Sequence, residues 1–436
     1  MRYENNWQSL NSRPVPGWFE DAKLGIFIHW GLYSVPAYAP IGDYAEWYGY
    51  ALRCAPSPEH QPTEHQKLYQ AFHKKYYGED FRYEDFVPRF TARHFDADEW
   101  AQLFRDAGAK YINLVSKHHD GFCLYQTDYA WNWNSVDVGP HRDFCAELKA
   151  ACDRSSVRFG VYHSIYEWYN PLYLQDPERY ALEHLIPMLK ELVTKYEPST
   201  LFTDGEWDHE SSVWHSTDFL TWLYNESPVR DFIVPNDRWG KETRGRLGGN
   251  LTTEYGLIDG GNEVTAIDRV SEECRGIGAS FGWNRFERPE HYLSEDALIK
   301  LFVDLISRGS NLLLNVGPTP DGRIPVIMQE RLRQLGAWLA VNGEGVYGSR
   351  KYRVVQEGDL RYTRVGDTVY AWLTRFPFGG ATLDVPYGEG LRVSLLGAPD
   401  FPVSLSDDGG RLRLTFGAYD PDKMPCRAVY GFRIER

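Results

Sequence analysis

Residues 96–122 read DADEWAQLFRDAGAKYINLVSKHHDGF, and this stretch decides the fold class. Its first half predicts a helix capped by Asp96 and ended by Gly108, because a capping side chain precedes an amphipathic run and a glycine follows it. Its second half predicts a buried strand that ends in a polar cluster, His118 to Asp120. A helix followed by an apolar strand is the repeating unit of parallel sheets whose strands are joined by helices.

The same rhythm of helix and strand continues from about residue 20 to residue 345. Further strands are predicted at 24–30, 157–164, 199–207, 232–240 and 311–318, and further helices at 142–156, 178–196, 216–227, 294–307 and 325–343. The number of units is near eight, which favours a closed (β/α)8-like barrel over an open sheet. The sequence therefore predicts an α/β fold with a barrel over residues 1–345.

Polar side chains with catalytic capacity recur where the predicted strands end. In a barrel of this kind the carboxyl ends of the strands converge on one face, which carries the active site. One such residue would mean little, but several in register indicate a functional face. These residues are His29, His118 to Asp120, His163, Asp204, Asn236 to Arg238, and Asn315.

The helical periodicity stops after about residue 345. Short alternating runs such as TVYAWLT and RLRLTF follow, separated by glycine-rich and Asp-Gly turns. Alternation with frequent turn signals is typical of antiparallel sheets. We therefore expect two domains, a catalytic barrel at 1–345 and an all-β sandwich at 346–436, with no linker between them.

Composition excludes several classes of partner. The 436 residues carry 47 Lys and Arg against 61 Asp and Glu, a net charge of -14 that repels a phosphate backbone, so nucleic acid is not expected. No apolar stretch approaches about 18 residues, so no membrane span is expected. The N-terminal stretch lacks the apolar centre of a signal peptide, which predicts a cytoplasmic protein unless a leader has been removed. Aromatic residues make up 15% of the chain, a surplus that suits stacking on sugar rings.

Two kinds of catalytic group compete in the sequence. The adjacent histidines His118 and His119 invite a metal site, but neighbouring residues on a strand point to opposite faces, so hydrogen bonding to a substrate is favoured. Carboxylates are the second kind: Asp204 in TDGEW, Glu254 in TTEY, and Glu272 and Glu273 in SEEC. A carboxylate pair suits glycoside hydrolysis, in which one group is ionised and the other protonated. Spacing alone does not choose the pair.

The chain resembles the α-L-fucosidases of glycoside hydrolase family 29. The resemblance runs in order along the barrel through these segments: AKLGIFIHWGLYSVPA, AEWY, AGAKYINLVSKHHDGF, FGVYHSIYEW, LFTDGEW, VPNDRWG, TTEY, RGIGASFGWNR, SRGSNLLLNVGPTPDG and NGEGVYGS. It implies a barrel followed by a β-sandwich, and retaining hydrolysis of terminal α-L-fucosides. No cofactor and no metal are implied.

The resemblance also implies roles for particular residues. Asp204 stands in the position of the nucleophile and Glu254, in T-x-E-Y, in that of the acid/base. Glu272 is the second choice for the acid/base, because Ser271 replaces the Trp that usually precedes that residue. The implied fucose-binding residues are His29, Glu46, Trp47, His118, His119, Tyr162 and Arg238.

The expected partner is a fucosylated oligosaccharide or glycoconjugate, and the sequence is compatible with a homo-oligomer. Two alternatives remain at this stage. One is a catalytically silent fucose-binding protein on the same fold, which would have no need of both Asp204 and Glu254. The other is a metal-dependent barrel hydrolase, which rests on the histidines alone.

Overall fold

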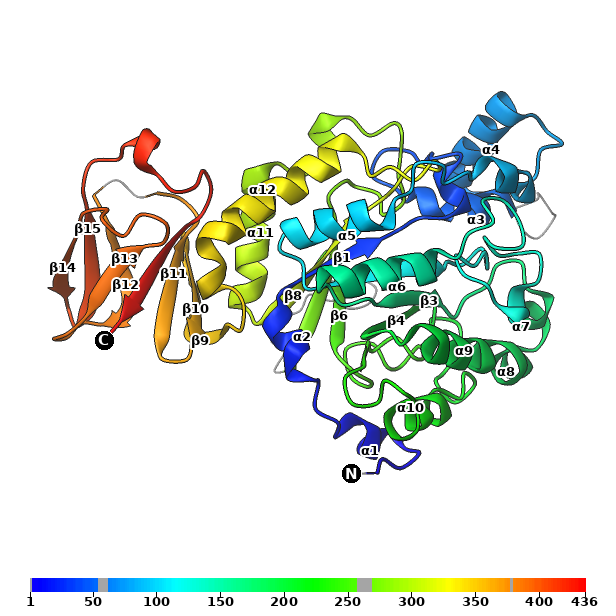
Figure 1. Cartoon of the computed structure of the whole chain (residues 1–436), viewed down its shortest axis with the longest axis horizontal. Coiled ribbons are helices and arrows are strands. Elements are labelled where there is room, and N and C mark those ends of the chain that lie inside the picture. Colours follow the sequence, from blue (N-terminus) through cyan, green and yellow to red (C-terminus); the bar gives the residue numbers. More distant parts are fainter. Residues whose placement is uncertain (1, 54–61, 257–268, 377–378) are drawn as a thin grey trace.

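The protein is described from a computed structural model that covers residues 2–53, 62–256, 269–376 and 379–436. A barrel of parallel strands surrounded by helices is followed by antiparallel sheets at one end of the molecule (Figure 1). This is the architecture predicted from the sequence. The barrel strands are β1 (Leu24–Ile28), β2 (Tyr111–Lys117), β3 (Val161–Ser164), β4 (Thr200–Asp204), β5 (Val234–Pro235), β6 (Leu251–Glu254), β7 (Ser271–Gly276) and β8 (Ser310–Val316).

The eight parallel strands follow the order β5-β4-β3-β2-β1-β8-β7-β6. The two outermost strands, β5 and β6, share no ladder among the described residues. Backbone hydrogen bonds join their surroundings instead: Asn250 N–H donates to Pro235 C=O at 3.0 Å and Gly249 N–H to Asn236 C=O at 3.0 Å. The barrel is therefore closed by a short seam between β5 and β6.

Helices cover the outside of the barrel (Figure 1). The connection from β5 to β6, residues 236–250, is a loop without a helix, and none was predicted there. The principal helices are α5 (Ala97–Asp106), α6 (Phe144–Ser155), α9 (Ile186–Tyr196), α10 (Ser216–Asn225), α11 (Glu295–Ser307) and α12 (Val326–Asn342). Shorter or peripheral helices are α1 (Trp7–Asn11), α2 (Gly17–Ala22), α3 (Tyr48–Arg53), α4 (Glu64–Tyr77), α7 (Pro171–Gln175) and α8 (Pro177–Tyr180).

The helix α5 and the strand β2 show how the sequence builds one unit of the barrel. The Asp96 side chain caps α5 by accepting from the backbone N–H groups of Asp98 and Glu99, as the sequence predicts. Gly108 follows with φ +88°, a left-handed conformation that ends the helix at little cost. In β2, alternate side chains then face the barrel interior and the outer helix layer, because strand side chains alternate between faces.

The C-terminal region is a sandwich of two antiparallel sheets, ordered β13-β16-β11-β10-β9 and β12-β15-β14. Part of its core forms a cluster of its own, which includes Tyr362, Leu383 and Phe432, while other residues such as Trp372 join the core of the barrel. Trp338 of α12 donates from its indole N–H to Val429 C=O at 2.9 Å, so the sandwich packs directly on the barrel helices. The strands are β9 (Arg350–Glu357), β10 (Leu360–Val365), β11 (Thr368–Leu373), β12 (Ala381–Pro386), β13 (Arg392–Leu395), β14 (Val403–Asp408), β15 (Arg411–Phe416) and β16 (Tyr430–Glu435).

The domain boundary predicted between residues 345 and 346 falls in the connection between α12 and β9. The division into two domains at this point stays a prediction. The two parts pack against each other through Trp338. Within the described ranges, no helix has the length and apolar character needed to cross a membrane.

Candidate active site

A cavity of about 190 Å³ lies at the carboxyl ends of the barrel strands. It is smaller than the roughly 300–1,000 Å³ common for ligand pockets, which suits a single small ring. Nine of the ten residues predicted from the sequence line it, and Glu272 does not. The nine are His29, Glu46, Trp47, His118, His119, Tyr162, Asp204, Arg238 and Glu254.

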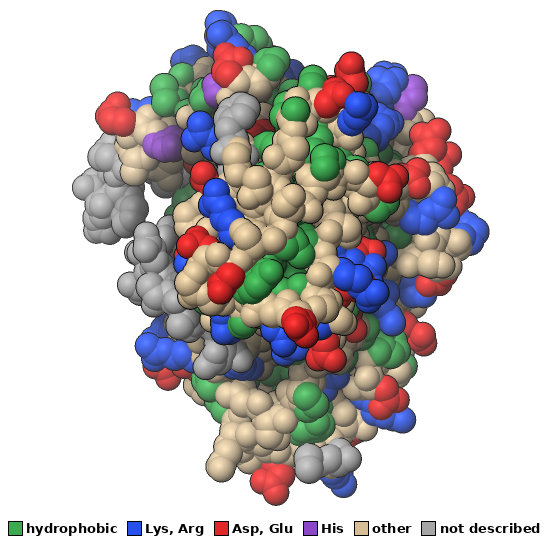
Figure 2. Space-filling view, turned by 90° about the vertical axis from the view of Figure 1, so that its left-hand side faces the viewer, with side chains coloured by type: hydrophobic (Ala, Val, Ile, Leu, Met, Phe, Trp, Pro, Cys, Tyr) green, Lys and Arg blue, Asp and Glu red, His purple; other side chains and the backbone are tan. Residues whose placement is uncertain are grey.

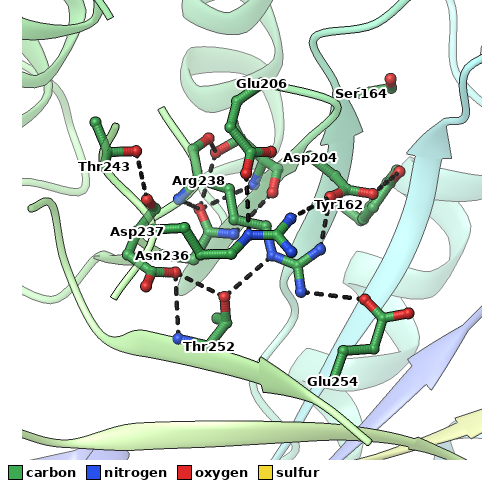
Figure 3. Close-up of polar contacts among 12 residues, drawn as sticks. Tyr162, Ser164, Asp204, Glu206, Asn236, Asp237, Arg238, Thr243, Thr252 and Glu254 are labelled. Atoms are coloured by element: carbon green, nitrogen blue, oxygen red, sulfur yellow. Dashed lines mark hydrogen bonds and ion pairs between the residues drawn. The ribbon is translucent and has the colours of Figure 1, made fainter. Parts of the chain in front are cut away.

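Asp204 is the last residue of β4, and Arg238 and Tyr162 hold its carboxylate (Figure 3). Arg238 Nη1 lies 2.6 Å from Oδ1, and the Tyr162 hydroxyl donates to Oδ2 at 2.9 Å. His119 Nε2 lies 3.8 Å from Oδ2. Burial alone would raise the pKa of Asp204, but nearby positive charge, above all that of the Arg238 guanidinium, lowers it to about 2. The carboxylate is therefore ionised near neutral pH.

Glu254 is the last residue of β6, and its side chain is 30% exposed toward the cavity. Arg238 Nη2 lies 3.4 Å from Oε2 of this carboxyl group. Burial raises the pKa of Glu254 above its ordinary value, and the negative charge of Asp204 raises it further against the opposing charge of Arg238. The pKa of Asp204 is thus lowered, which favours its ionised form, and the pKa of Glu254 is raised, which favours its protonated form.

Arg238 connects the two carboxyl groups and is itself fixed by a hydrogen-bond chain (Figure 3). Its Nε donates to Thr252 Oγ1 at 3.0 Å, and that hydroxyl donates to Asp237 Oδ1 at 2.6 Å. Only 3% of the Arg238 side chain is exposed, so its guanidinium has little freedom to turn away. The spacing between Asp204 and Glu254 is therefore set by a rigid, buried arginine.

Three buried histidines line the cavity in the neutral form. Burial lowers the pKa of His29 to about 3 and that of His119 to about 4, and it lowers the pKa of His118 well below its ordinary value. A neutral imidazole carries one donor and one acceptor nitrogen, which suits a sugar hydroxyl.

The hydrogen bonds behind His29 settle which of its nitrogens carries the proton. Asn315 donates from Nδ2 to Phe281 C=O at 2.7 Å, so its Oδ1 accepts from His29 Nδ1 at 2.7 Å. The remaining nitrogen, Nε2, then carries a lone pair. His119 is arranged in the same way: Ser164 donates to Tyr166 C=O, so Ser164 Oγ accepts from His119 Nδ1 at 2.6 Å. Both rings are left with an acceptor Nε2.

Glu46 and a set of aromatic rings complete the wall. Glu46 Oε2 accepts from Gly282 N–H at 2.7 Å, and burial raises the pKa of Glu46 to about 8, which keeps it protonated near neutrality. Trp47 stacks with Trp207 at a centroid distance of 6.0 Å. The apolar rings give the cavity a surface for the CH groups of a ligand.

Glu272 lies outside the cavity, in contrast to the other predicted residues. It is the second residue of β7 and accepts a hydrogen bond from Tyr111, the first residue of β2. The side chain is buried at 2% exposure, and burial raises its pKa to about 7. The structure therefore places Glu272 near the amino-terminal end of the strands, away from Asp204.

Several residues at the site were not singled out from the sequence. Tyr44, Trp207 and Phe281 line the cavity: Tyr44 immediately precedes the AEWY segment, and the other two lie within LFTDGEW and RGIGASFGWNR. Arg244 contacts both Asp204 Oδ1 at 3.4 Å and Glu206 Oε1 at 3.0 Å. The loop that carries Arg244 has no pattern that signals such a contact, because its path depends on the closure of the barrel.

The arrangement fits hydrolysis of a glycosidic bond. A pocket sized for one sugar holds an ionised carboxylate, a carboxyl group with a raised pKa, neutral imidazoles and aromatic rings. Among the residues with described positions, no group of three or more His, Cys, Asp or Glu is arranged to hold a metal ion.

Comparison with known proteins agrees with this chemistry. The sequence model of a family described as alpha-L-fucosidase matches residues 1–344. A tissue alpha-L-fucosidase from Bos taurus is 40% identical over 99% of this chain and 91% of its own length, and a plasma alpha-L-fucosidase from Rattus norvegicus is 41% identical over 98% and 93%. A crystal structure of the Thermotoga maritima alpha-fucosidase with a mechanism-based inhibitor superposes with a TM-score of 0.83 at 35% identity, covering 99% of this chain and 100% of that one.

The fold, the carboxyl pair and these similarities define a glycoside hydrolase. Within that class, the chain belongs to the alpha-L-fucosidase family. The β-sandwich and the barrel expected from the resemblance are both present.

One expectation from the sequence is wrong. The cytoplasmic location predicted from the N-terminal stretch is contradicted by relatives that are tissue alpha-L-fucosidases of cattle, rat and human and a plasma alpha-L-fucosidase of rat. The prediction was drawn from the N-terminal stretch alone. The similarity to these relatives, in contrast, extends over nearly the whole chain.

Proposed function

We propose that this protein is a retaining α-L-fucosidase that hydrolyses terminal α-L-fucosides of oligosaccharides or glycoconjugates through a covalent fucosyl-enzyme. The observation that carries the proposal is the contact of one buried guanidinium, that of Arg238, with both Asp204 and Glu254. A shared guanidinium keeps both carboxyl groups within reach of one side chain, which favours the short spacing of retaining enzymes, about 5–5.5 Å. Inverting enzymes need a wider gap, since a water molecule must fit between the carboxylate and the sugar.

The opposite pKa shifts support a different role for each carboxyl group. Asp204, ionised by its cationic neighbours, attacks the anomeric carbon of fucose, while protonated Glu254 donates its proton to the leaving oxygen. Glu254, now a carboxylate, then takes a proton from water, and the resulting oxygen displaces Asp204 from the anomeric carbon. Two inversions leave fucose in its α configuration, and both residues return to their starting protonation states.

Recognition of the sugar follows from the wall of the cavity. The acceptor Nε2 atoms of His29 and His119 and the protonated carboxyl of Glu46 can pair with ring hydroxyls. The buried Nδ1 of His118 has no partner among the described residues, which leaves it available to a bound sugar. Apolar rings such as Phe281 suit the C6 methyl group that distinguishes fucose from most hexoses.

A silent fucose-binding protein is the alternative on the same fold. The pair of carboxyl groups with opposed pKa shifts favours the enzyme, because binding alone needs no such pair.

The decisive experiment is hydrolysis of an aryl α-L-fucoside followed by NMR from the first seconds. We expect α-fucose to appear before its β anomer, with the rate unchanged by a chelator. Initial β-fucose would overturn the retaining mechanism, a loss of activity with chelator and recovery with zinc would favour a metal hydrolase, and binding of fucose without turnover would favour the silent protein.

A further inference from the structure

A second cavity, of about 510 Å³, lies at the rim of the barrel, separate from the fucose pocket. The segment around residues 89–93, the loop after β7 and the loop after β8 form its walls. We call it the arginine cleft, because its lining includes Arg89, Arg93, Trp283, Arg285, Asp321 and Arg323.

The positive charge of the arginine cleft is largely uncompensated. Asp321, 3.2 Å from Arg323, is the one carboxylate that pairs with a cleft arginine in the described part of the chain. Arg285 donates to Val35 C=O at 2.6 Å and lies over the Trp283 ring, and Arg89 lies over aromatic rings rather than beside an acid. The cleft therefore gathers four cations and one anion.

This concentration of positive charge contrasts with the overall charge of the molecule. The chain carries a net charge of -14, and an arginine on its surface commonly lies beside a carboxylate. Figure 2 shows the sandwich end, where basic and acidic side chains are interspersed rather than gathered by sign. Four arginines around one hollow create a local positive potential that attracts an anion against the overall charge.

The residue types point to the chemistry of the ligand. All the cations that line the cleft are arginines, whose planar guanidinium binds sulfate or carboxylate with two parallel hydrogen bonds, whereas lysine offers only a point charge. Trp283 is half-buried and presents an aromatic surface of the kind that stacks on a sugar ring. An anionic group on a ring is therefore favoured over a bare ion.

We propose that the arginine cleft binds an acidic saccharide, one that carries a sulfate ester or a carboxylate. The choice of a saccharide rests on the proposed function, since this enzyme acts on glycans. The loop after β7 supports a connection between the two sites, because Phe281 lines the fucose pocket and Trp283, two residues further on, lines the arginine cleft. An acidic branch of a fucosylated glycan is thereby held at the rim of the barrel.

The test measures binding with probes that contain no fucose, so its result does not depend on catalysis. Lactose, lactose 3′-sulfate, 3′-sialyllactose and sodium sulfate are titrated calorimetrically against the wild type, Arg93→Gln and Arg89→Gln. Loss of one charge-assisted contact should weaken lactose 3′-sulfate or 3′-sialyllactose by about tenfold. Arg179→Gln, which removes an exposed arginine on α8, is the matched control and should bind as the wild type does.

Each outcome decides part of the proposal. Binding of lactose 3′-sulfate alone, or of 3′-sialyllactose alone, identifies the acidic group and supports the cleft. Equal binding of lactose, or unchanged binding by Arg93→Gln and Arg89→Gln, would overturn it. Sodium sulfate binding as tightly as lactose 3′-sulfate would mean an adventitious ion only. Both arginine variants should hydrolyse an aryl fucoside at the wild-type rate, so failure here is distinct from failure of the proposed function.

Discussion

Glu254→Gln and Glu272→Gln form a matched pair of substitutions, because each replaces a carboxyl group with an amide of the same shape. Glu254 faces the cavity at 30% exposure and contacts Arg238, whereas Glu272 is buried at 2% against Tyr111. If Glu254 is the acid, Glu254→Gln removes the proton that the leaving group needs. General acid catalysis contributes roughly 10²–10⁴-fold, so we expect a loss of that size on fucosyllactose, whose sugar leaving group is poor.

A nitrophenyl fucoside distinguishes this loss from general damage. The nitrophenolate leaving group departs almost without acid help. Glu254→Gln should therefore lower the rate of cleavage of the nitrophenyl fucoside far less than the rate of cleavage of fucosyllactose. Glu272→Gln should reduce both rates by similar factors. Its main effect is on stability: a poorer partner for the buried Tyr111 hydroxyl costs about 1–3 kcal/mol of the free energy of unfolding. Initial rates on both substrates and thermal denaturation of both variants provide the comparison.

The pH profile gives an independent check of the same assignment. Burial raises the pKa of Glu254, so wild-type activity should fall as the pH rises through that value and the proton is lost. The alkaline limb should disappear in Glu254→Gln and persist in Glu272→Gln. A limb that survives in Glu254→Gln would be assigned to Glu46, whose pKa burial raises to about 8. Substrate-dependent losses in Glu272→Gln alone would reverse the assignment of the acid.

Three further predictions concern other parts of the site. Asp204→Gly should lose nearly all turnover and recover it with azide, giving β-fucosyl azide by NMR; near wild-type hydrolysis would refute the nucleophile. Asn315→Asp should favour the imidazolium form of His29, because a carboxylate would then face Nδ1. The ring loses its acceptor Nε2, so KM should rise more than kcat falls. An unchanged KM would contradict the proton assignment. Lys117→Met should lower the free energy of unfolding by about 3–5 kcal/mol in denaturant titrations, because the buried carboxylate of Glu167 loses its ammonium partner. Adding Glu167→Gln should restore part of the loss; a mild effect of Lys117→Met alone would mean that the other partners of Glu167, such as His184, compensate for the missing ammonium.

Much of the barrel could be predicted because its signals are local. The Asp96 cap, the apolar run of β2 and the polar residues at successive strand ends each lie within a few positions of one another. Polar residues at strand ends such as Asp204 and Arg238 converge because the parallel strands all point the same way. The nine predicted residues that the cavity wall contains follow from this rule together with the family resemblance.

The remaining features depend on contacts between distant segments. Glu254 and Glu272 both stand in short β-rich stretches, but Glu254 ends β6 while Glu272 is near the beginning of β7. The level of a carboxyl group along the barrel depends on strand register, which is set by pairing with neighbouring strands rather than by the sequence around it. The contact of Arg244 with Asp204 likewise depends on a loop without regular structure.

The contacts that close the barrel between β5 and β6 make enzyme activity depend on this closure. In the described part of the chain, backbone hydrogen bonds from Gly249 and Asn250 close this gap. Side-chain contacts across it join Asp237 and Arg238 to Thr252 and Glu254. The same contacts fasten the barrel and hold the carboxyl pair at its working distance. If β5 and β6 separate locally on heating, turnover stops while the other strands stay folded. Loss of activity should therefore occur at a lower temperature than loss of the circular dichroism signal.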